Sequence, residues 1–273
     1  MTVRVIATAL LAATLAACGG TSSGSTGGAK GTMVLATTTS TRDTGLLDVL
    51  VPAFERGSAC SVKTVAVGSG QALALGERGD ADVLLVHSPD AEQAFMKAGH
   101  GLSRRAVMHN DFVVVGPPGD PAAVARTHSA PDAFKRIAAA HAPFASRGDA
   151  SGTNAKELKI WHAAGITPHG SWYFKTGQGM GETLTIASQK RAYTLSDRGT
   201  FLATKGLESK ILEQGDPALQ NYYHVIVVRH PGTNVACAKA FSAWITSPAT
   251  QRLIGAFGRA KYGRPLFHPD AAG

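Results

Sequence analysis

Residues 33–88 decide the fold of this chain. They read MVLATTTSTRDTGLLDVLVPAFERGSACSVKTVAVGSGQALALGERGDADVLLVHS. Three runs with the character of strands alternate with two segments whose apolar residues recur at helical spacing. These segments predict a strand, a helix, a strand, a helix and a strand over residues 33–40, 44–57, 60–70, 71–79 and 81–88. The stretch therefore predicts parallel strands covered by helices.

The alternation continues beyond residue 88. Residues 109–121, HNDFVVVGPPGDP, predict a strand that prolines and glycine end, as where a chain leaves one domain. Residues 221–230, NYYHVIVVRH, predict a return crossing, and residues 236–258 predict a helical C-terminal stretch. We expect an α/β fold of two lobes joined by two crossings, with the ligand cleft between the lobes. The expected boundaries are a first lobe at 32–115, a second lobe at 116–222, and residues 223–273 packing back toward the first.

The N-terminus predicts export. One positive charge in residues 1–4 precedes an apolar run over residues 5–17, and Leu15-Ala16-Ala17-Cys18 ends it. This pattern is typical of a secretory signal, and the run is too short to span a bilayer comfortably. The small residues before Cys18 favour a lipobox, with Cys18 as the acylated first residue; an ordinary cleaved signal is the alternative. We expect a signal peptide at 1–18, a flexible linker rich in Gly, Ser and Thr at 19–31, and a lipoprotein anchored in the periplasm or at the cell surface.

Charge and cysteine content limit the partners. The net charge is +8 and the pI about 9.6, but Lys and Arg are spread along the chain, so we expect no nucleic-acid binding. A moderate positive field would attract a small anion. With Cys18 acylated, Cys60 and Cys237 remain. An oxidising compartment permits a disulfide between them, but their sequence positions do not establish one, and we take them as buried thiols.

Four strand-to-helix corners are rich in hydroxyls and glycine. They span residues 37–45, 68–73, 146–153 and 176–183. A helix start presents unpaired amide hydrogens and a partial positive charge, which suit an anion, and glycine allows a ligand to approach the backbone. Because ligand crevices in α/β sheets lie beyond the carboxyl ends of strands, the corners of both lobes are expected to converge on one cleft.

Each corner also has a simpler explanation. Ser, Thr and Asp are common N-caps, so TTTS or DASGT alone indicates a cap more readily than a binding site. The third corner, SRGDASGT, is more informative because the guanidinium of Arg147 presents a fixed fork of donors to an oxyanion. Asp149 is positioned either to hold that guanidinium or to cap the next helix. An RGD tripeptide also occurs by chance and as an adhesion motif, but no other feature supports adhesion.

Several motifs together resemble one family. They are TTTSTRDTGLLDVLVPAFE, VKTVAVGSGQALALGERGDADVLLVHSPDAE, NDFVVVGPPGDPA, FASRGDASGTNAKELKIW, YFKTGQGMGETL, AYTLSDRGTFLA and YHVIVVRHPG. In this order, from about Met33 to Gly263, the chain resembles the tungstate-binding proteins of Tup ABC transporters. The resemblance implies a type II periplasmic-binding-protein fold that closes on an oxyanion and delivers it to a membrane permease.

The resemblance also implies the ligand residues. The family's TTTS motif falls on residues 37–40, its second oxyanion turn on residues 68–70, and its SRGDxSGT motif on residues 146–153. At the position of Ser69 the family often has threonine. Serine retains the hydroxyl, so the difference preserves the donor. Residues 179–181 are a weaker part of the expected lining. The expected ligand residues are Thr38, Thr39, Ser40, Ser69, Gly70, Arg147, Ser151, Thr153 and Thr183. Tungstate is the expected ligand, with molybdate or another oxyanion as alternatives, and we expect a monomer with no cofactor and no coordinated metal cation.

These residues predict binding rather than turnover. An exported hydrolase is the less favoured alternative, because the sequence has neither a G-x-S-x-G elbow nor an H-E-x-x-H helix. His87, His100, His109 and His162 have no companions at metal-ligand spacing, and solitary histidines are usually surface or satisfied core residues. A sensor that docks a signalling partner when liganded would have the same site. Trp161, Trp172 and Trp244 lie in apolar contexts and are expected to pack in the core.

Overall fold

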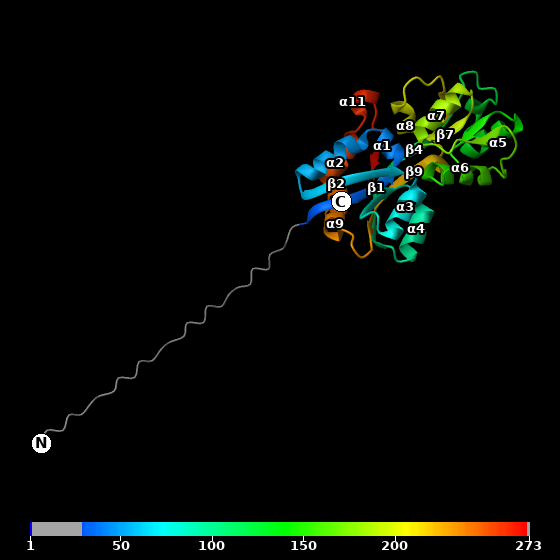
Figure 1. Cartoon of the computed structure of the whole chain (residues 1–273). Coiled ribbons are helices and arrows are strands. Elements are labelled where there is room, and N and C mark those ends of the chain that lie inside the picture. The colour runs from blue at the N-terminus through cyan, green and yellow to red at the C-terminus, as the bar shows by residue number, and fades with distance from the viewer. Residues whose placement is uncertain (2–28, 272–273) are drawn as a thin grey trace.

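The computed structural model describes Met1 and residues 29–271 of the chain, and it consists of two lobes (Figure 1). The first part of the chain contains β1 (Lys30–Thr38), α1 (Thr39–Asp43), α2 (Leu46–Arg56), β2 (Ala59–Val67), α3 (Ser69–Arg78), β3 (Val83–Val86), α4 (Pro89–Lys97) and β4 (Gly101–Gly116). The βαβαβ unit that residues 33–88 predict is thus present, with the short α1 as an additional helix. Helix α4 was not predicted.

The second lobe follows β4. It contains the 3-10 turn η1 (Val124–Arg126), α5 (Ala130–Ala139), β5 (Phe144–Ser146), α6 (Gly152–Ala163), β6 (Tyr173–Lys175), α7 (Met180–Gln189), β7 (Thr194–Asp197), α8 (Arg198–Ala203), β8 (Lys210–Glu213) and η2 (Pro217–Leu219). The chain then returns through β9 (Gln220–Val228) to α9 (Val235–Ile245), α10 (Pro248–Ala256), α11 (Arg259–Tyr262) and β10 (His268–Pro269). Below, lobe 2 means η1 through η2, and lobe 1 means the other elements apart from the crossing strands β4 and β9.

The sheets are mixed, which corrects the expectation of purely parallel strands. Strands β1, β2 and β3 are parallel, but β9 runs antiparallel to both β3 and β4. The reason is that β4 carries the chain into lobe 2 and β9 brings it back, so the neighbouring crossings run in opposite directions. Strand β4 pairs with β9 as far as Asp111 and with β7 from Phe112 onward. The boundaries expected at 115 and 222 fall within these crossing strands.

Each lobe has its own apolar core. In lobe 1, α2 and α9 cover one face of the sheet through Leu50, Phe54 and Phe241, while α3 and α4 cover the other. In lobe 2, Phe134 and Phe144 pack around Trp161 at ring-centroid distances of 4.4 and 5.2 Å. Trp172 and Trp244 also pack against these cores, as the sequence predicts. Two separately packed lobes leave the corners between them available for a ligand.

Cys60 and Cys237 form a disulfide, so the expectation of free thiols is wrong. Cys60 lies at the beginning of β2 and Cys237 in the first turn of α9, with their Cα atoms 5.9 Å apart. The two cysteines are 177 positions apart in sequence, so only the return of the chain through β9 brings them together. The bond ties the C-terminal helices to the first half of lobe 1.

The expected linker ends earlier than residue 31, because Lys30 and Gly31 already belong to β1. The signal peptide, Cys18 and linker residues 19–28 lie outside the described residues. Within the described part of the chain, no helix has both the length and the apolar character that crossing a membrane requires.

Candidate oxyanion site

The four predicted corners lie together between the lobes. The N-terminus of α3 presses on the loop before α6: a Cβ on Gly70 would lie 2.9 Å from the carbonyl oxygen of Ala150, so only glycine fits without a shift. Thr39 approaches the other two corners, since its Oγ1 lies 3.5 Å from Arg147 Nη2 and would lie 3.7 Å from a Cβ on Gly179. The predicted convergence is therefore present in the geometry.

The lobe 1 side of the site is built from buried hydroxyls. Strand β1 ends at Thr38, whose side chain accepts a hydrogen bond from Thr41 N at 3.2 Å and so caps α1. The hydroxyl of Ser40 lies 3.4 Å from His87 Nε2, and that of Ser69 accepts from His87 N at 3.5 Å. Thr38, Ser40 and Ser69 each expose 1% of their surface or less. Thr39 is partly exposed and faces lobe 2.

Arg147 is the principal charge of the lobe 2 side, and it exposes only 3% of its surface. Its Nε donates to the carbonyl of Gln178 at 3.2 Å, and its Nη2 donates to Asp149 Oδ2 at 2.5 Å. Among the described residues, these contacts and Thr39 occupy Nε and Nη2 and leave the two hydrogens of Nη1 available. The side chain is thus held in place with donors to spare.

Asp149 positions Arg147 and the next helix at the same time. Its Oδ2 accepts from Arg147, and its Oδ1 accepts from Ser151 N at 3.2 Å. The sequence left open which of the two roles Asp149 has, and the structure assigns both. Each carboxylate oxygen of Asp149 thus already accepts one hydrogen bond from its own loop.

Helix α6 begins directly at the cleft. Ser151 caps it by accepting from Asn154 N at 3.1 Å, and Gly152 lies against His87, where a Cβ would come within 2.7 Å of the His87 carbonyl oxygen. The hydroxyl of Thr153 is buried and has no hydrogen-bond partner among the described residues. A buried hydroxyl without a partner is costly, so this one is poised to bond to a ligand.

The corner before α7 is placed less directly than the other three. The hydroxyl of Thr183 bonds to Thr176 Oγ1 at 2.8 Å and lies 3.5 Å from the carbonyl of Gln178, which also accepts from Arg147. Thr183 therefore supports the loop that holds Arg147, and its role as a direct ligand stays a prediction. Met180, expected to line the site, instead packs in an apolar cluster with Val113, Val115 and Leu184.

His87 is a satisfied core histidine beside the cleft, as solitary histidines usually are. Its Nδ1 is 3.0 Å from Asn221 Oδ1, and Asn221 in turn donates to Asn110 Oδ1 at 2.7 Å. Burial, aided by the charge of Arg147, lowers the pKa of His87 to about 3, so the ring is neutral at physiological pH. In the sequence, the burial of His87 is indicated by its position immediately after the apolar run VLLV.

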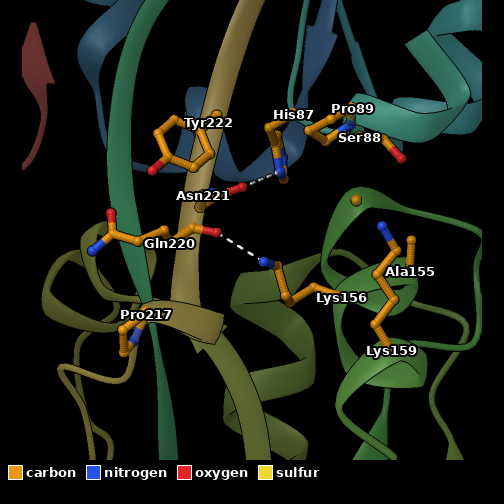
Figure 2. A pocket seen from close by; sticks show the side chains of 11 residues that line it. His87, Ser88, Pro89, Ala155, Lys156, Lys159, Pro217, Gln220, Asn221 and Tyr222 are labelled. Carbon is orange, nitrogen blue, oxygen red and sulfur yellow. Dashed lines mark hydrogen bonds between the residues drawn. The ribbon is translucent and has the colours of Figure 1, made fainter. Parts of the chain in front are cut away.

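A cavity of about 130 Å³ lies on the other side of His87 (Figure 2). Lys156 and Lys159 of α6 line it opposite His87, and Gln220 and Asn221 of β9 line the crossing-strand side. Lys156 Nζ donates to the carbonyls of Ala218 and Gln220 at 2.9 and 2.8 Å. The ammonium therefore fixes α6 to the crossing strand.

Sequence reasoning missed one further polar corner, at the end of β7. Asp197 and Thr200 are both completely buried there, and Thr200 Oγ1 donates to the carbonyl of Ser40 at 3.4 Å. The pattern TLSDRGT has the same form as the predicted corners, a short strand followed by an acidic cap, a glycine and a threonine. The sequence does not distinguish this corner, because an aspartate after a short strand is also an ordinary helix cap.

The site can hold an anion without a metal ion. Arg147, the buried hydroxyls and the starts of α3, α6 and α7 supply a positive charge and oriented donors from both lobes. Such groups replace the hydration that a dianion loses on burial. The arrangement is therefore suited to binding a small oxyanion.

Comparisons with known proteins agree with this geometry. Residues 19–249 match a family model described as "PBP superfamily domain". The tungstate-binding protein TupA of Peptoclostridium acidaminophilum is 49% identical over 250 residues, 89% of this chain and 87% of that protein. The protein in the crystal structure of the tungstate ABC transporter from Geobacter sulfurreducens has 45% sequence identity to this chain. The two structures match with a TM-score of 0.75 over 83% of this chain and 98% of that one. The tungstate-binding protein TupA from Desulfovibrio alaskensis is 42% identical, with a TM-score of 0.73 over 88% and 99%. The chain therefore belongs to the PBP superfamily and, within it, to the family of the tungstate-binding protein TupA.

Proposed function

We propose that this protein captures tungstate outside the cytoplasm and delivers it to the permease of an ABC transporter. The observation that carries the proposal is the meeting of buried donors from both lobes around Arg147. The names of the relatives supply the identity of the ion, because tungstate, molybdate and sulfate are tetrahedral dianions of nearly the same shape. Binding would be followed by closure of the lobes, since a ligand that bridges donors on both sides favours the closed form.

The donor-rich lining of the site supports a fully ionised ligand. Hydrogen phosphate carries a proton at neutral pH and needs an acceptor, whereas tungstate, molybdate and sulfate need donors alone. The groups around Arg147 are mainly hydroxyl donors, and the nearby Asp149 already accepts hydrogen bonds from Arg147 and Ser151. Because the relatives are named for tungstate, we expect tungstate to bind best, molybdate next, and sulfate and phosphate more weakly.

Calorimetric titration with these four ions tests the proposal. Arg147→Gln should weaken tungstate binding by about 1.5 kcal/mol or more, which is over tenfold, because a charge-assisted hydrogen bond is lost. Arg78→Gln is the matched control, since Arg78 also pairs with an aspartate two positions away, Asp80, but on the exposed surface. A folded Arg147→Gln protein with unchanged affinity would remove Arg147 from the site. Sulfate displacing tungstate at equal concentration would overturn the proposed ligand.

The location and form of the mature protein belong to the same proposal. We infer a lipoprotein that acts as a monomer. Residues 1–18 would direct its export, and acylated Cys18 would anchor it in the membrane. The support is the sequence Leu15-Ala16-Ala17-Cys18. The mass of the N-terminal peptide from the mature protein tests the anchor: an unacylated peptide that begins elsewhere would contradict it.

A further inference from the structure

Asp197 is the one buried carboxyl near the cleft, within the described part of the chain, that has an unpartnered oxygen. It ends β7, opposite Phe112 of β4, and it is completely inaccessible to solvent. Its Oδ1 accepts from Thr200 N at 2.8 Å and so caps α8. Its Oδ2 is buried without a partner among the described residues. A buried ionised carboxylate normally has all its acceptor positions satisfied, so this arrangement makes the ionised form of Asp197 more costly than that of an exposed aspartate.

Asp197 is linked to the candidate oxyanion site through Thr200. Thr200, whose amide bonds to Asp197, donates its hydroxyl to the carbonyl of Ser40 in the TTTS corner. A Cβ on Gly199 would lie 3.4 Å from Asp197 Oδ1 and 2.7 Å from the Thr44 methyl group, which places the carboxyl against the segment around α1. Only Thr200 therefore separates Asp197 from the backbone of a predicted ligand turn.

None of the neighbouring charged groups forms an ion pair with the Asp197 carboxyl among the described residues. Burial raises its pKa to about 6; hydrogen bonding by Thr200 and, less strongly, the charge of Arg147 oppose that shift, and Asp43 of α1 adds to it. The adjacent Arg198 turns away and pairs with Asp111 through its Nε at 2.8 Å. Tyr223 of β9 also lies close, and the charge of Asp197 helps to raise the pKa of its hydroxyl. Arg147, the positive charge that acts on Asp197, is also the charge that an oxyanion would engage.

We propose that Asp197 takes up a proton when the cleft binds a doubly charged oxyanion. The inference rests on the proposed function. A buried dianion would repel an ionised Asp197 and would also engage Arg147, which is the charge that favours the ionised form. Both effects favour protonation of the carboxyl. Asp197 is thus a residue that tunes affinity for dianions rather than one that donates to them.

Other titratable groups near the cleft are less suited to this role. Glu157 of α6 is buried, but its Oε2 accepts from Ser146 and its Oε1 accepts from both Trp161 and Tyr173. His87 has a pKa of about 3 and would need a far larger shift to gain a proton near neutral pH. Asp43 is partly exposed and pairs with Arg42. Among them, only Asp197 combines complete burial with an unpartnered oxygen.

The direction of the pH dependence follows from linkage. Near pH 7.5 the free protein holds Asp197 mainly ionised, because its pKa is about 6. If the bound ion raises that pKa above 7.5, the complex holds one proton more than the free protein. Tungstate affinity should then fall by up to about tenfold per pH unit as the pH rises from 6.5 toward the pKa of the complex. Below pH 6 this contribution should level off, since both states are then protonated.

Calorimetry with sodium tungstate tests the proposal. Titrations at pH 7.5 in two buffers that differ in ionisation enthalpy, neither of them phosphate, give the number of protons taken up. We expect close to one for the wild-type protein. Asp197→Asn should bind tungstate with little proton uptake, with affinity nearly flat between pH 6.5 and 8.5, and at least as tightly as the wild type at pH 8.5. Asparagine keeps the acceptor for Thr200 N, and Asp43→Asn is the control that removes a neighbouring charge and should retain the uptake.

The possible outcomes separate this inference from the proposed function. Tungstate binding without proton uptake by the wild-type protein would overturn the role of Asp197 and leave the proposed function standing. Uptake that persists in Asp197→Asn, or that disappears in Asp43→Asn or Glu157→Gln instead, would assign the proton to another group. A wild-type protein that does not bind tungstate at all would overturn both. If the Asp197 variant does not fold, absence of uptake by the wild type still overturns the inference, and retention of uptake by both Asp43→Asn and Glu157→Gln supports it.

Discussion

At the scale of single residues, Asp197 should cost the ligand-free protein stability. Its folded pKa of about 6 exceeds the ordinary value of 3.8, so the folded state disfavours the ionised carboxyl. This cost is absent below pH 3.8, grows between pH 3.8 and 6, and is complete above pH 6. Asp197→Asn should therefore raise the free energy of unfolding by about 1–3 kcal/mol at pH 7.5 and by much less at pH 4. Urea unfolding at both pH values measures this, and an equal change at both would contradict it.

The sequence made some of these residues predictable and not others. Arg147 stood out because it is a lone guanidinium in a glycine-rich turn, a composition with few structural explanations. Asp197 did not stand out, because an aspartate after a strand is also an ordinary helix cap, and its cap bond to Thr200 N is indeed present. What distinguishes it is the second carboxyl oxygen, buried without a partner. Burial of that kind depends on segments distant in sequence.

At the scale of elements, the start of α6 should serve both stability and binding. Ser151→Ala removes the cap at Asn154 N and should lower the free energy of unfolding by about 1 kcal/mol. It should also weaken tungstate binding by about threefold to tenfold, the worth of one neutral hydrogen bond, because the cap orders amides that face the cleft. Ser129→Ala is the matched control, since Ser129 caps α5 in the same way through Asp132 N. Equal affinity losses in both variants would contradict a local role for α6.

Helices and strands of strong periodicity were predictable, and short ones were not. Helices α2 and α3 lie where the helical spacing of residues 44–57 and 71–79 predicts them, and the corners before α3 and α6 lie where the sequence placed them. Strand β8 and helix α8 are only 4 and 6 residues long, so neither carries enough periodicity to be recognised. The pairing of β9 with both β3 and β4 was not predicted either, because pairing between strands distant in sequence depends on the path of the whole chain.

At the scale of the whole molecule, the disulfide should stabilise lobe 1 without affecting the site. Cys60 lies at the beginning of β2, and the cleft lies beyond its other end, at Gly68. A Cys60→Ala, Cys237→Ala double variant should lose about 2–4 kcal/mol of stability. Its tungstate affinity should be unchanged at temperatures where it is folded. Thermal unfolding with and without a reductant tests this: the reductant should destabilise the wild type and leave the variant as it is.

The order in which the lobes can be completed follows from the two crossing strands. The segment between them, residues 117–219, forms lobe 2 together with the second half of β4, which directly precedes it. Lobe 1 needs β9 and α9 from beyond residue 219 to complete its sheet and to close its disulfide. A chain that emerges from its N-terminus therefore offers lobe 2 every contact it requires while lobe 1 still waits for its last strand. The N-terminal half should thus be the later of the two to mature, with its unpaired β3 edge the part most in need of protection until then.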